Sequence, residues 1–188
     1  MFYGSGILPK IVKEAKLDPN TQYIFCSNHS SILDVPFMFL ISKKPISFIG
    51  KESLAKIPIF GYYYRTFNVL VNRKSIRDSY MAFQKAGEQI KEEKNMVIFP
   101  EGGIVDNKVR LSRFKNGLFR LAIEQNITII PITFADNHAI FPAAYTKGKP
   151  GIARVFIHKG VKPQNKEVDS LKQEVYNIID QQLIKYEN

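Results

Sequence analysis

The chain has 188 residues, of which 45% are hydrophobic and 23% are charged, a composition that excludes a disordered chain and suits a globular domain. It carries 27 Lys and Arg against 17 Asp and Glu, so the net charge is +10 and the expected partners are anionic: nucleic acid, an anionic bilayer or phosphorylated small molecules. The single cysteine, Cys26, excludes an intramolecular disulfide; its apolar surroundings favour a buried core residue over a nucleophile.

The sequence bears on membrane contact in two ways. It contains no run of about 18 apolar residues, the length that a membrane-spanning helix needs. Residues 1–6 also lack the basic head and apolar middle of a signal peptide. We therefore expect any contact with a membrane to take place at its surface.

Strand-like and helix-like patterns alternate along the chain. Residues 1–20 are weakly patterned, with a short amphipathic turn over residues 7–12 and a second turn over residues 18–20. Ser31 is the expected N-cap of the first helix, in a capping box with Asp34. The proline at position 131 indicates that its strand bends or lies near a sheet edge. The later patterns predict strands over residues 21–27, 46–49, 67–72, 96–99, 127–134 and 153–158, and helices over residues 31–42, 51–65, 75–94, 114–122 and 168–178.

This alternation is typical of an α/β fold with a mostly parallel central sheet flanked by helices. We expect a single domain over residues 1–188. Within it, residues 1–20 form a lead-in, residues 21–135 form the core that carries the motifs, and residues 136–188 add a strand and a helix at the C-terminus.

The stretch Asn28–Asp34 lies where a predicted strand passes into a predicted helix, a position at which α/β proteins often bind ligands. It carries the imidazole of His29 and the carboxylate of Asp34, five residues apart. One interpretation makes His29 a general base that Asp34 orients. The other is a buried or capping histidine, with Asp34 as a favourable charge at the helix N-terminus. The spacing alone does not decide between them.

A second candidate loop, Phe99–Gly103, follows another predicted strand. Its two glycines allow the backbone to approach a ligand closely or to present N–H groups to an oxygen, and Glu101 could bind a hydroxyl. The alternative is an ordinary turn with a surface carboxylate. Backbone N–H groups near Gly102 or in the 28–31 junction are candidate oxyanion donors.

Basic residues are concentrated in two stretches. Residues 53–77 and 107–123 carry five Lys or Arg each and no acid, so they could line one phosphate-binding groove or form solvated helix faces. In residues 57–65, apolar and aromatic side chains beside cations suit either an interfacial segment that dips into a bilayer or ordinary core packing. His138 and His158 have no metal-ligand spacing, so no metal site is predicted.

Four blocks, taken in order, resemble those of the glycerolipid acyltransferase family, the PlsC-like 1-acylglycerol-3-phosphate acyltransferases. Asn28–Asp34 is similar to the first block of that family, an Asn-His-x-Ser-x-x-Asp pattern. The similarity covers about residues 21–135. The second block is Lys51–Leu54 with Ile57–Gly61 and Val71–Arg73, the third is Phe99–Gly102, and the fourth is Ile129–Ile132.

The resemblance implies a glycerol-phosphate acyltransferase-like fold and an enzyme that moves an acyl group from acyl-CoA or acyl-carrier protein to the hydroxyl of a lysophospholipid. The expected acceptor is 1-acylglycerol-3-phosphate, giving phosphatidic acid. His29 would be the base and Asp34 its partner, Arg73 would hold the acceptor phosphate, and Pro131 would help to shape the acyl side. The substrate-binding residues implied in this way are Asn28, Lys51, Arg73, Glu101, Gly102, Gly103, Lys115 and Pro131.

The same resemblance implies no cofactor beyond the acyl donor, which is a co-substrate. It implies an anionic membrane surface as a partner and a peripheral location on the cytoplasmic face of the cell membrane. Nucleic acid is not expected, because the aromatic residues cluster around Pro58 and Gly61 and do not alternate with cations as a base-stacking surface would.

The sequence departs from the family pattern in the third block. The family usually continues as Glu-Gly-Thr-Arg-Ser, whereas residues 101–105 read Glu-Gly-Gly-Ile-Val, so a hydroxyl and a cation are missing. Lys108, Arg110 or Lys115 is the expected replacement cation; otherwise the acceptor is another lyso-lipid. The alternative hypothesis is a catalytically silent module on the same fold that binds anionic lipids. Family members also often carry a hydrophobic segment before the first block, where this chain has about twenty weakly apolar residues.

Overall fold

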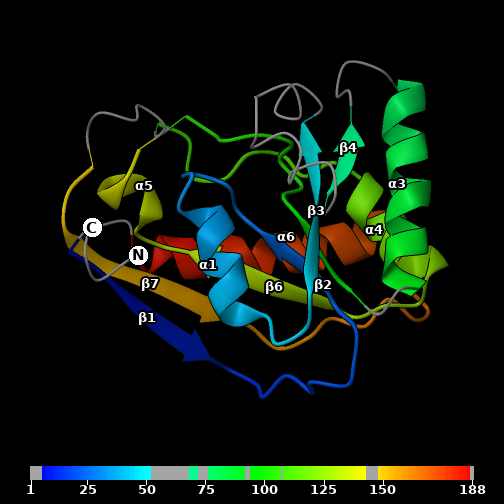
Figure 1. Ribbon diagram of the computed structural model, residues 1–188, viewed down its shortest axis with the longest axis horizontal. Coiled ribbons are helices and arrows are strands. Elements are labelled where there is room, and N and C mark those ends of the chain that lie inside the picture. Colours follow the sequence, from blue (N-terminus) through cyan, green and yellow to red (C-terminus); the bar gives the residue numbers. More distant parts are fainter. Residues whose placement is uncertain are drawn as a thin grey trace.

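The structure is a computed structural model that describes residues 6–51, 68–71, 76–91, 94–106, 108–142 and 148–186. In this part of the chain seven strands form one sheet in the order β1-β7-β6-β2-β5-β3-β4 (Figure 1). The elements are β1 (Ile7–Lys13), β2 (Ile24–Ser27), α1 (Asp34–Ile41), β3 (Ile46–Lys51), β4 (Val69–Val71), α3 (Ile76–Lys91), β5 (Asn95–Ile98), α4 (Gly117–Glu124), β6 (Ile129–Phe134), α5 (Asn137–Ile140), β7 (Gly151–Ile157) and α6 (Val168–Ile184).

The sheet is mostly parallel. Strands β6, β2, β5, β3 and β4 run in one direction. Strand β7 is antiparallel to β6, and β1 is parallel to β7, so these last two strands run the opposite way. The predicted α/β fold with a mostly parallel central sheet is therefore confirmed. The carboxyl ends of the five parallel strands meet at one edge, where ligand sites of such sheets are usually found.

Helices cover both faces of the sheet, and each face has its own apolar core. Side chains of α1 and α5 pack on the face that carries Phe25, Val97 and Ile130. Side chains of α3, α4 and α6 pack on the other face, which carries Ile24 and Met96. Strands β2, β5 and β6 are buried along their whole length, which explains why they read as continuous apolar runs. No helix of the described residues is both long and apolar enough to span a bilayer.

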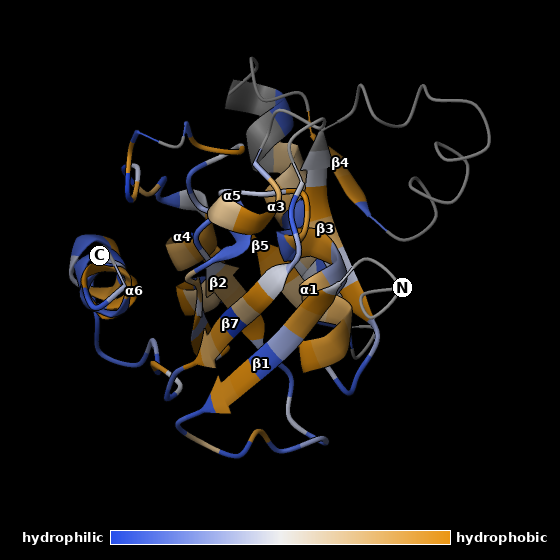
Figure 2. Cartoon of the chain, turned by 90° about the vertical axis from the view of Figure 1, so that its left-hand side faces the viewer, coloured by the Kyte–Doolittle hydropathy of each residue, from blue (hydrophilic) through white to orange (hydrophobic). Residues whose placement is uncertain are grey.

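The prediction of an amphipathic turn over residues 7–12 is wrong, because these residues belong to strand β1. The strand pairs in parallel with β7 from Ile7 opposite Gly151 to Lys13 opposite Ile157. It lies at the sheet edge and carries lysines between its apolar residues (Figure 2), which is typical of an edge strand and hides the strand pattern. Its hydrogen-bonding partner, β7, lies about 140 residues later in the sequence, so local patterns could not predict this strand.

The expectation that Pro131 lies near a sheet edge is wrong, since β6 lies inside the sheet between β2 and β7, whereas the alternative, a bend at Pro131, stays a prediction. Pro131 pairs with Cys26 of β2, and its carbonyl accepts a hydrogen bond from the His158 amide at 3.0 Å. The C=O and N–H of a strand residue point to the same neighbour, so the missing N–H faces β7. The antiparallel ladder with β7 covers only Ile132–Phe134, and the proline lies just beyond its end.

Candidate active site

Polar residues from three segments converge where the parallel strands end. His29 follows β2, Glu101 follows β5, and Asn137 begins α5 after β6. These strands are neighbours in the order β6-β2-β5, which brings the segments that follow them together although they are far apart in the sequence. The first and third blocks of the sequence therefore meet at one edge of the sheet.

His29 lies against Asp34 in the geometry of a base and its orienting acid. The His29 Nδ1 atom is 2.9 Å from Asp34 Oδ2, and the His29 side chain is 12% exposed. The imidazole stacks on the ring of Phe99, with centroids 3.9 Å apart and an angle of 17° between the planes. The ring is thus held from one side by Asp34 and over one face by Phe99.

Asp34 is fully buried and acts as an acceptor of several hydrogen bonds. Its Oδ2 atom accepts the amides of Ser30 at 2.8 Å and Ser31 at 2.9 Å, in addition to His29. Its Oδ1 atom accepts the side-chain amide of Asn137 at 2.8 Å. Both oxygens of Asp34 already accept N–H donors, so the arrangement fits a His29 that donates from Nδ1 and keeps its lone pair on Nε2.

The same contacts begin helix α1. Asp34 reaches back to the Ser31 amide, which is the acidic half of the predicted capping box. The Ser31 hydroxyl accepts the Leu33 amide at 3.1 Å instead of the Asp34 amide, and the regular helix begins only at Asp34. Asp34 therefore serves the fold and the candidate site together.

Glu101 joins the two loops of the site. One oxygen accepts the His29 amide at 2.7 Å and the other accepts the Ser112 amide at 2.8 Å. Burial raises the pKa of Glu101 to about 7, although these two backbone hydrogen bonds oppose the shift. Both carboxylate oxygens are thus bound within the protein, and the predicted contact of Glu101 with an acceptor hydroxyl stays a prediction.

The predicted oxyanion donors are already used by the protein itself. The amides of His29, Ser30 and Ser31 bind the carboxylates of Glu101 and Asp34. The amide of Gly102 donates to the Phe99 carbonyl at 3.1 Å. The amides of residues 29–31 position the two carboxylates and the Gly102 amide closes a turn, so the assignment to an oxyanion is corrected for these four groups.

Lys115 lies directly over Gly102. Gly102 has a φ of +86°, and a Cβ atom added there would lie 2.5 Å from Lys115 Nζ. The Lys115 amide also donates to the Pro100 carbonyl at 2.9 Å. Of the three candidate replacement cations, Arg110 is instead paired with Asp180 at 2.8 Å. The structure thus keeps Lys115 beside the third block, next to Gly102 and the partly exposed Gly103.

Of the four other predicted substrate-binding residues, the structure describes the side chains of Asn28 and Pro131. Asn28 is 3% exposed, and its amide exchanges two 2.9 Å hydrogen bonds with the backbone of Phe134. Its side chain thus ties the first block to strand β6, and its predicted contact with a substrate stays a prediction. Pro131 lies inside β6 at the level of Cys26, and its predicted role at the acyl side stays a prediction. The side chain of Lys51 and the whole of Arg73 lie outside the described residues, as do residues 57–65.

Sequence patterns did not identify Asn137 as part of the site. This residue is fully buried and binds Asp34, which lies 103 positions earlier in the chain. The available signal was its place directly after a buried strand, in the polar run Asp136-Asn137-His138. In the described residues, no three His, Cys, Asp or Glu side chains lie close enough to hold a metal.

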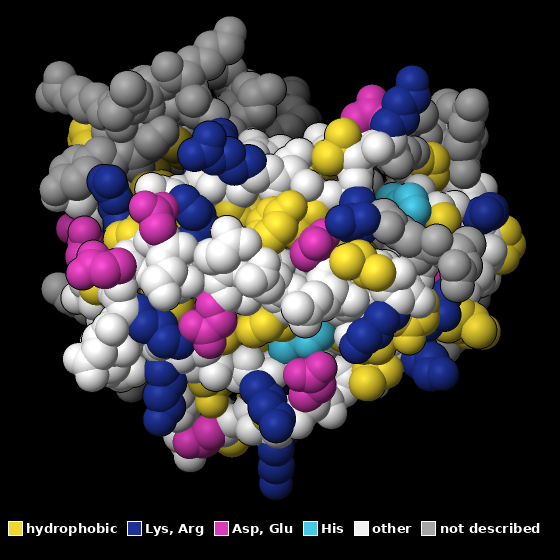
Figure 3. Space-filling model, turned by 180° about the vertical axis from the view of Figure 1, so that it is seen from behind, with side chains coloured by type: hydrophobic (Ala, Val, Ile, Leu, Met, Phe, Trp, Pro, Cys, Tyr) yellow, Lys and Arg dark blue, Asp and Glu magenta, His cyan; other side chains and the backbone are white. Residues whose placement is uncertain are grey.

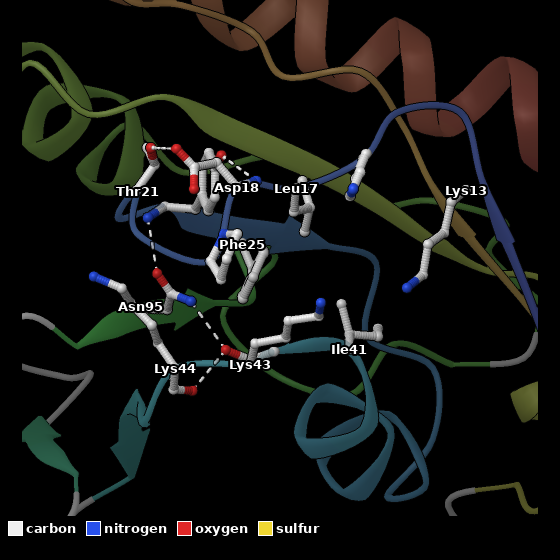
Figure 4. A pocket seen from close by; sticks show the side chains of 13 residues that line it. Lys13, Leu17, Asp18, Thr21, Phe25, Ile41, Lys43, Lys44 and Asn95 are labelled. Carbon is white, nitrogen blue, oxygen red and sulfur yellow. Dashed lines mark hydrogen bonds between the residues drawn. The ribbon is translucent and has the colours of Figure 1, made fainter.

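A small cavity of about 60 Å³ lies at the other end of the parallel strands, where β2 and β5 begin (Figure 4). Apolar side chains such as Phe25 and Ile41 line it, and Lys13 and Lys43 extend toward its opening.

On the face seen in Figure 3, Lys and Arg side chains are spread out with Asp and Glu between them.

Comparisons with known proteins identify the family of the chain. The model of the Acyltransferase family matches residues 9–135. A 1-acyl-sn-glycerol-3-phosphate acyltransferase of Chlamydomonas reinhardtii is 29% identical over 81% of this chain and 46% of that protein. A chloroplastic 1-acyl-sn-glycerol-3-phosphate acyltransferase of Arabidopsis thaliana is 30% identical over 76% of this chain and 40% of that protein. The lyso-ornithine lipid O-acyltransferase of Pseudomonas aeruginosa is 27% identical over 68% of this chain and 48% of that protein.

The fold has a solved counterpart. The crystal structure of the 1-acyl-sn-glycerophosphate acyltransferase PlsC from Thermotoga maritima superposes with a TM-score of 0.79, covers 93% of this chain and 71% of that one, and is 23% identical in sequence. This chain spans less than half the length of the three relatives named above. The matched family model includes both loops of the candidate site, and the chain belongs to the Acyltransferase family.

Proposed function

We propose that the protein transfers a fatty acyl group from a thioester, acyl-CoA or acyl-carrier protein, to the free hydroxyl of a lysophospholipid. The observation that carries this proposal is the His29–Asp34 pair, in which Asp34 occupies Nδ1 and leaves Nε2 of the imidazole as a base. Transfer of this kind needs a base because a lipid hydroxyl is a weak nucleophile until its proton is removed.

The proposed reaction proceeds in two steps. The Nε2 atom of His29 takes the hydroxyl proton while the hydroxyl oxygen attacks the thioester carbonyl carbon. The tetrahedral intermediate then collapses, the carbon–sulfur bond breaks, and the departing thiolate takes the proton back from His29. Asp34 stabilises the imidazolium between these steps and holds the ring in one tautomer. No covalent acyl-enzyme is required.

We propose 1-acylglycerol-3-phosphate as the acceptor, giving phosphatidic acid, with Lys115 contributing the cation that the third block lacks. The position of Lys115 over Gly102 supports this assignment. A second acceptor class, lyso-ornithine lipid, is the alternative, since a relative acting on it is similar over 68% of this chain. The altered residues Gly103 and Ile104 are where the two acceptors would be distinguished.

We also propose a peripheral location on the cytoplasmic face of the cell membrane, at an anionic bilayer surface. The net charge of +10 supports this location. On α1, the apolar side chains of Phe39 and Leu40 are 61% and 48% exposed, and Lys43 follows shortly after them. Exposed apolar groups beside cations suit an interface between lipid headgroups and water.

The test is acyl transfer to a panel of lyso-lipid acceptors, with the products identified by mass spectrometry. We expect His29→Ala to lower the rate on the order of 10² to 10⁴-fold, the usual contribution of a general base. His138→Ala, which removes an exposed histidine, is the matched control and should leave the rate unchanged. Undiminished turnover by a folded His29→Ala variant would refute the mechanism.

Two observations favour a second candidate, a silent lipid-binding module. The third block is altered, and the candidate oxyanion amides are used within the protein. Flotation with anionic vesicles, run beside an assay of thioester consumption, separates the two candidates. Binding without turnover for every acceptor of the panel would favour the module, whereas turnover would exclude it.

A further inference from the structure

The segment Phe134–Phe141 contacts the first block at three separate points. Asn28 exchanges two 2.9 Å hydrogen bonds with Phe134, and Asp34 accepts a 2.8 Å hydrogen bond from Asn137. The Ser31 hydroxyl donates to the Phe141 carbonyl at 2.5 Å. Three polar residues of the first block are therefore hydrogen-bonded to this one later segment. Of the hydrogen bonds from the segment, the one from Asn137 reaches the candidate catalytic pair itself.

Asn137 gives Asp34 a contact that no backbone group supplies in the described structure. The Oδ2 atom of Asp34 binds His29 and two backbone amides, whereas its Oδ1 atom binds the Asn137 side chain. Both Asp34 and Asn137 are completely buried. A buried carboxylate oxygen without a donor would be costly, so the Asn137 amide holds the carboxylate in one orientation.

The other end of the Asn137 side chain is unsatisfied. Its Oδ1 atom is buried and has no hydrogen-bond partner within the described part of the chain. A buried oxygen without a donor destabilises the folded state, and asparagine is therefore a poor choice for stability alone at this position. The amide nitrogen faces Asp34 because only the nitrogen can donate to a carboxylate.

We propose that Asn137 is a positioning residue that holds Asp34 so that Oδ2 stays on His29 Nδ1 and His29 Nε2 stays free. This role rests on the proposed function, in which Nε2 is the base. Asn137 touches neither the imidazole nor the reacting atoms in this arrangement. Its loss acts through Asp34, whose carboxylate can turn when Oδ1 has no donor, and His29 then populates both tautomers.

Two variants and one control test the role. Asn137→Leu removes the donor at similar volume, and Asn137→Asp keeps the shape but places a second carboxyl against Asp34. Asn95→Leu is the matched control, because Asn95 is also buried, at 3% exposure, and binds Tyr23 and Ser42 at the opposite edge of the sheet. All three are compared with the wild type by thermal unfolding to separate a loss of fold from a loss of position.

The first readout is kinetic. We expect both Asn137 variants to lower kcat on the order of 10 to 100-fold with little change in KM, as usual for a residue that orients a catalytic side chain. The Asn137→Asp deficit should shrink as the pH falls, because a protonated carboxyl can donate to Asp34 as the amide does. Asn95→Leu should lower stability without changing kcat. A deficit independent of pH, or equal in the Asn95 variant, would overturn the proposal.

The second readout does not depend on turnover. Nitrogen NMR of ¹⁵N-histidine-labelled protein reports which ring nitrogen of neutral His29 carries the proton. We expect a single tautomer with the proton on Nδ1 in the wild type and in Asn95→Leu, and a mixture in Asn137→Leu. An unchanged tautomer in Asn137→Leu would refute the positioning role, even if the wild type transferred no acyl group. An inactive wild type with the expected tautomers would refute only the proposed function.

Discussion

Glu101 makes the stability of the protein depend on pH in a direction opposite to that of most carboxylates. Burial raises its pKa from the ordinary 4.5 to about 7. The unfolded chain therefore loses this proton near pH 4.5, whereas the folded protein keeps it until about pH 7. Between these values the folded state binds more protons, so the free energy of unfolding falls as the pH rises.

The size of this fall in unfolding free energy follows from the shift in the pKa of Glu101. A difference of about 2.5 pKa units at about 1.4 kcal/mol per unit amounts to about 3 kcal/mol over this interval. The perturbation is Glu101→Gln, which cannot titrate. The glutamine oxygen can accept only one of the two backbone amides, of His29 and Ser112, and the glutamine NH₂ group then faces the other amide. The loss of this hydrogen bond lowers stability by an amount that does not vary with pH.

The assay is urea denaturation of the wild type and of Glu101→Gln at several pH values between about 4.5 and 8. We expect the difference, wild type minus variant, to fall by about 3 kcal/mol up to about pH 7 and to level off above it. Glu124→Gln, which removes an exposed carboxylate, controls for the change in net charge. A constant difference would refute the reasoning and mean that the two backbone hydrogen bonds fully offset the burial.

Two further predictions concern other charged groups. Lys115→Gln should raise KM for a phosphate-bearing acceptor roughly 3 to 10-fold with kcat unchanged, because it removes one charge-assisted contact at an exposed position. The control is Lys108→Gln, and equal effects of both variants in steady-state kinetics would contradict the assignment. Burial lowers the pKa of His158 below 6.5, against the opposing contact with Glu14, so the unfolded chain takes up this proton first as the pH falls. The unfolding free energy of the wild type should therefore decrease below about pH 6.5 relative to His158→Gln in the same urea assay, and a parallel pH dependence of the two proteins would show that His158 does not contribute.

The central strands were predictable because each is apolar along its whole length. All residues of β2, β5 and β6 are buried, so the hydrophobic pattern and the strand coincide. The edge strand β1 was not predictable, because Pro9 and Lys10 interrupt its apolar pattern and because its partner strand β7 lies near the other end of the chain. The interior position of Pro131 likewise depends on where the ladder with β7 ends.

The sequence by itself determined the fold class and the family resemblance, and that resemblance implied the pairing of His29 with Asp34. These depend on local order: alternating elements, four blocks in sequence, and two residues at one strand-to-helix junction. Only the tertiary structure decided what surrounds the pair. The Asn28 side chain and the loop amides bind other groups of the protein, and Asn137 binds Asp34. These contacts form because parallel strands bring their carboxyl ends to the same end of the sheet, whatever their separation in the chain.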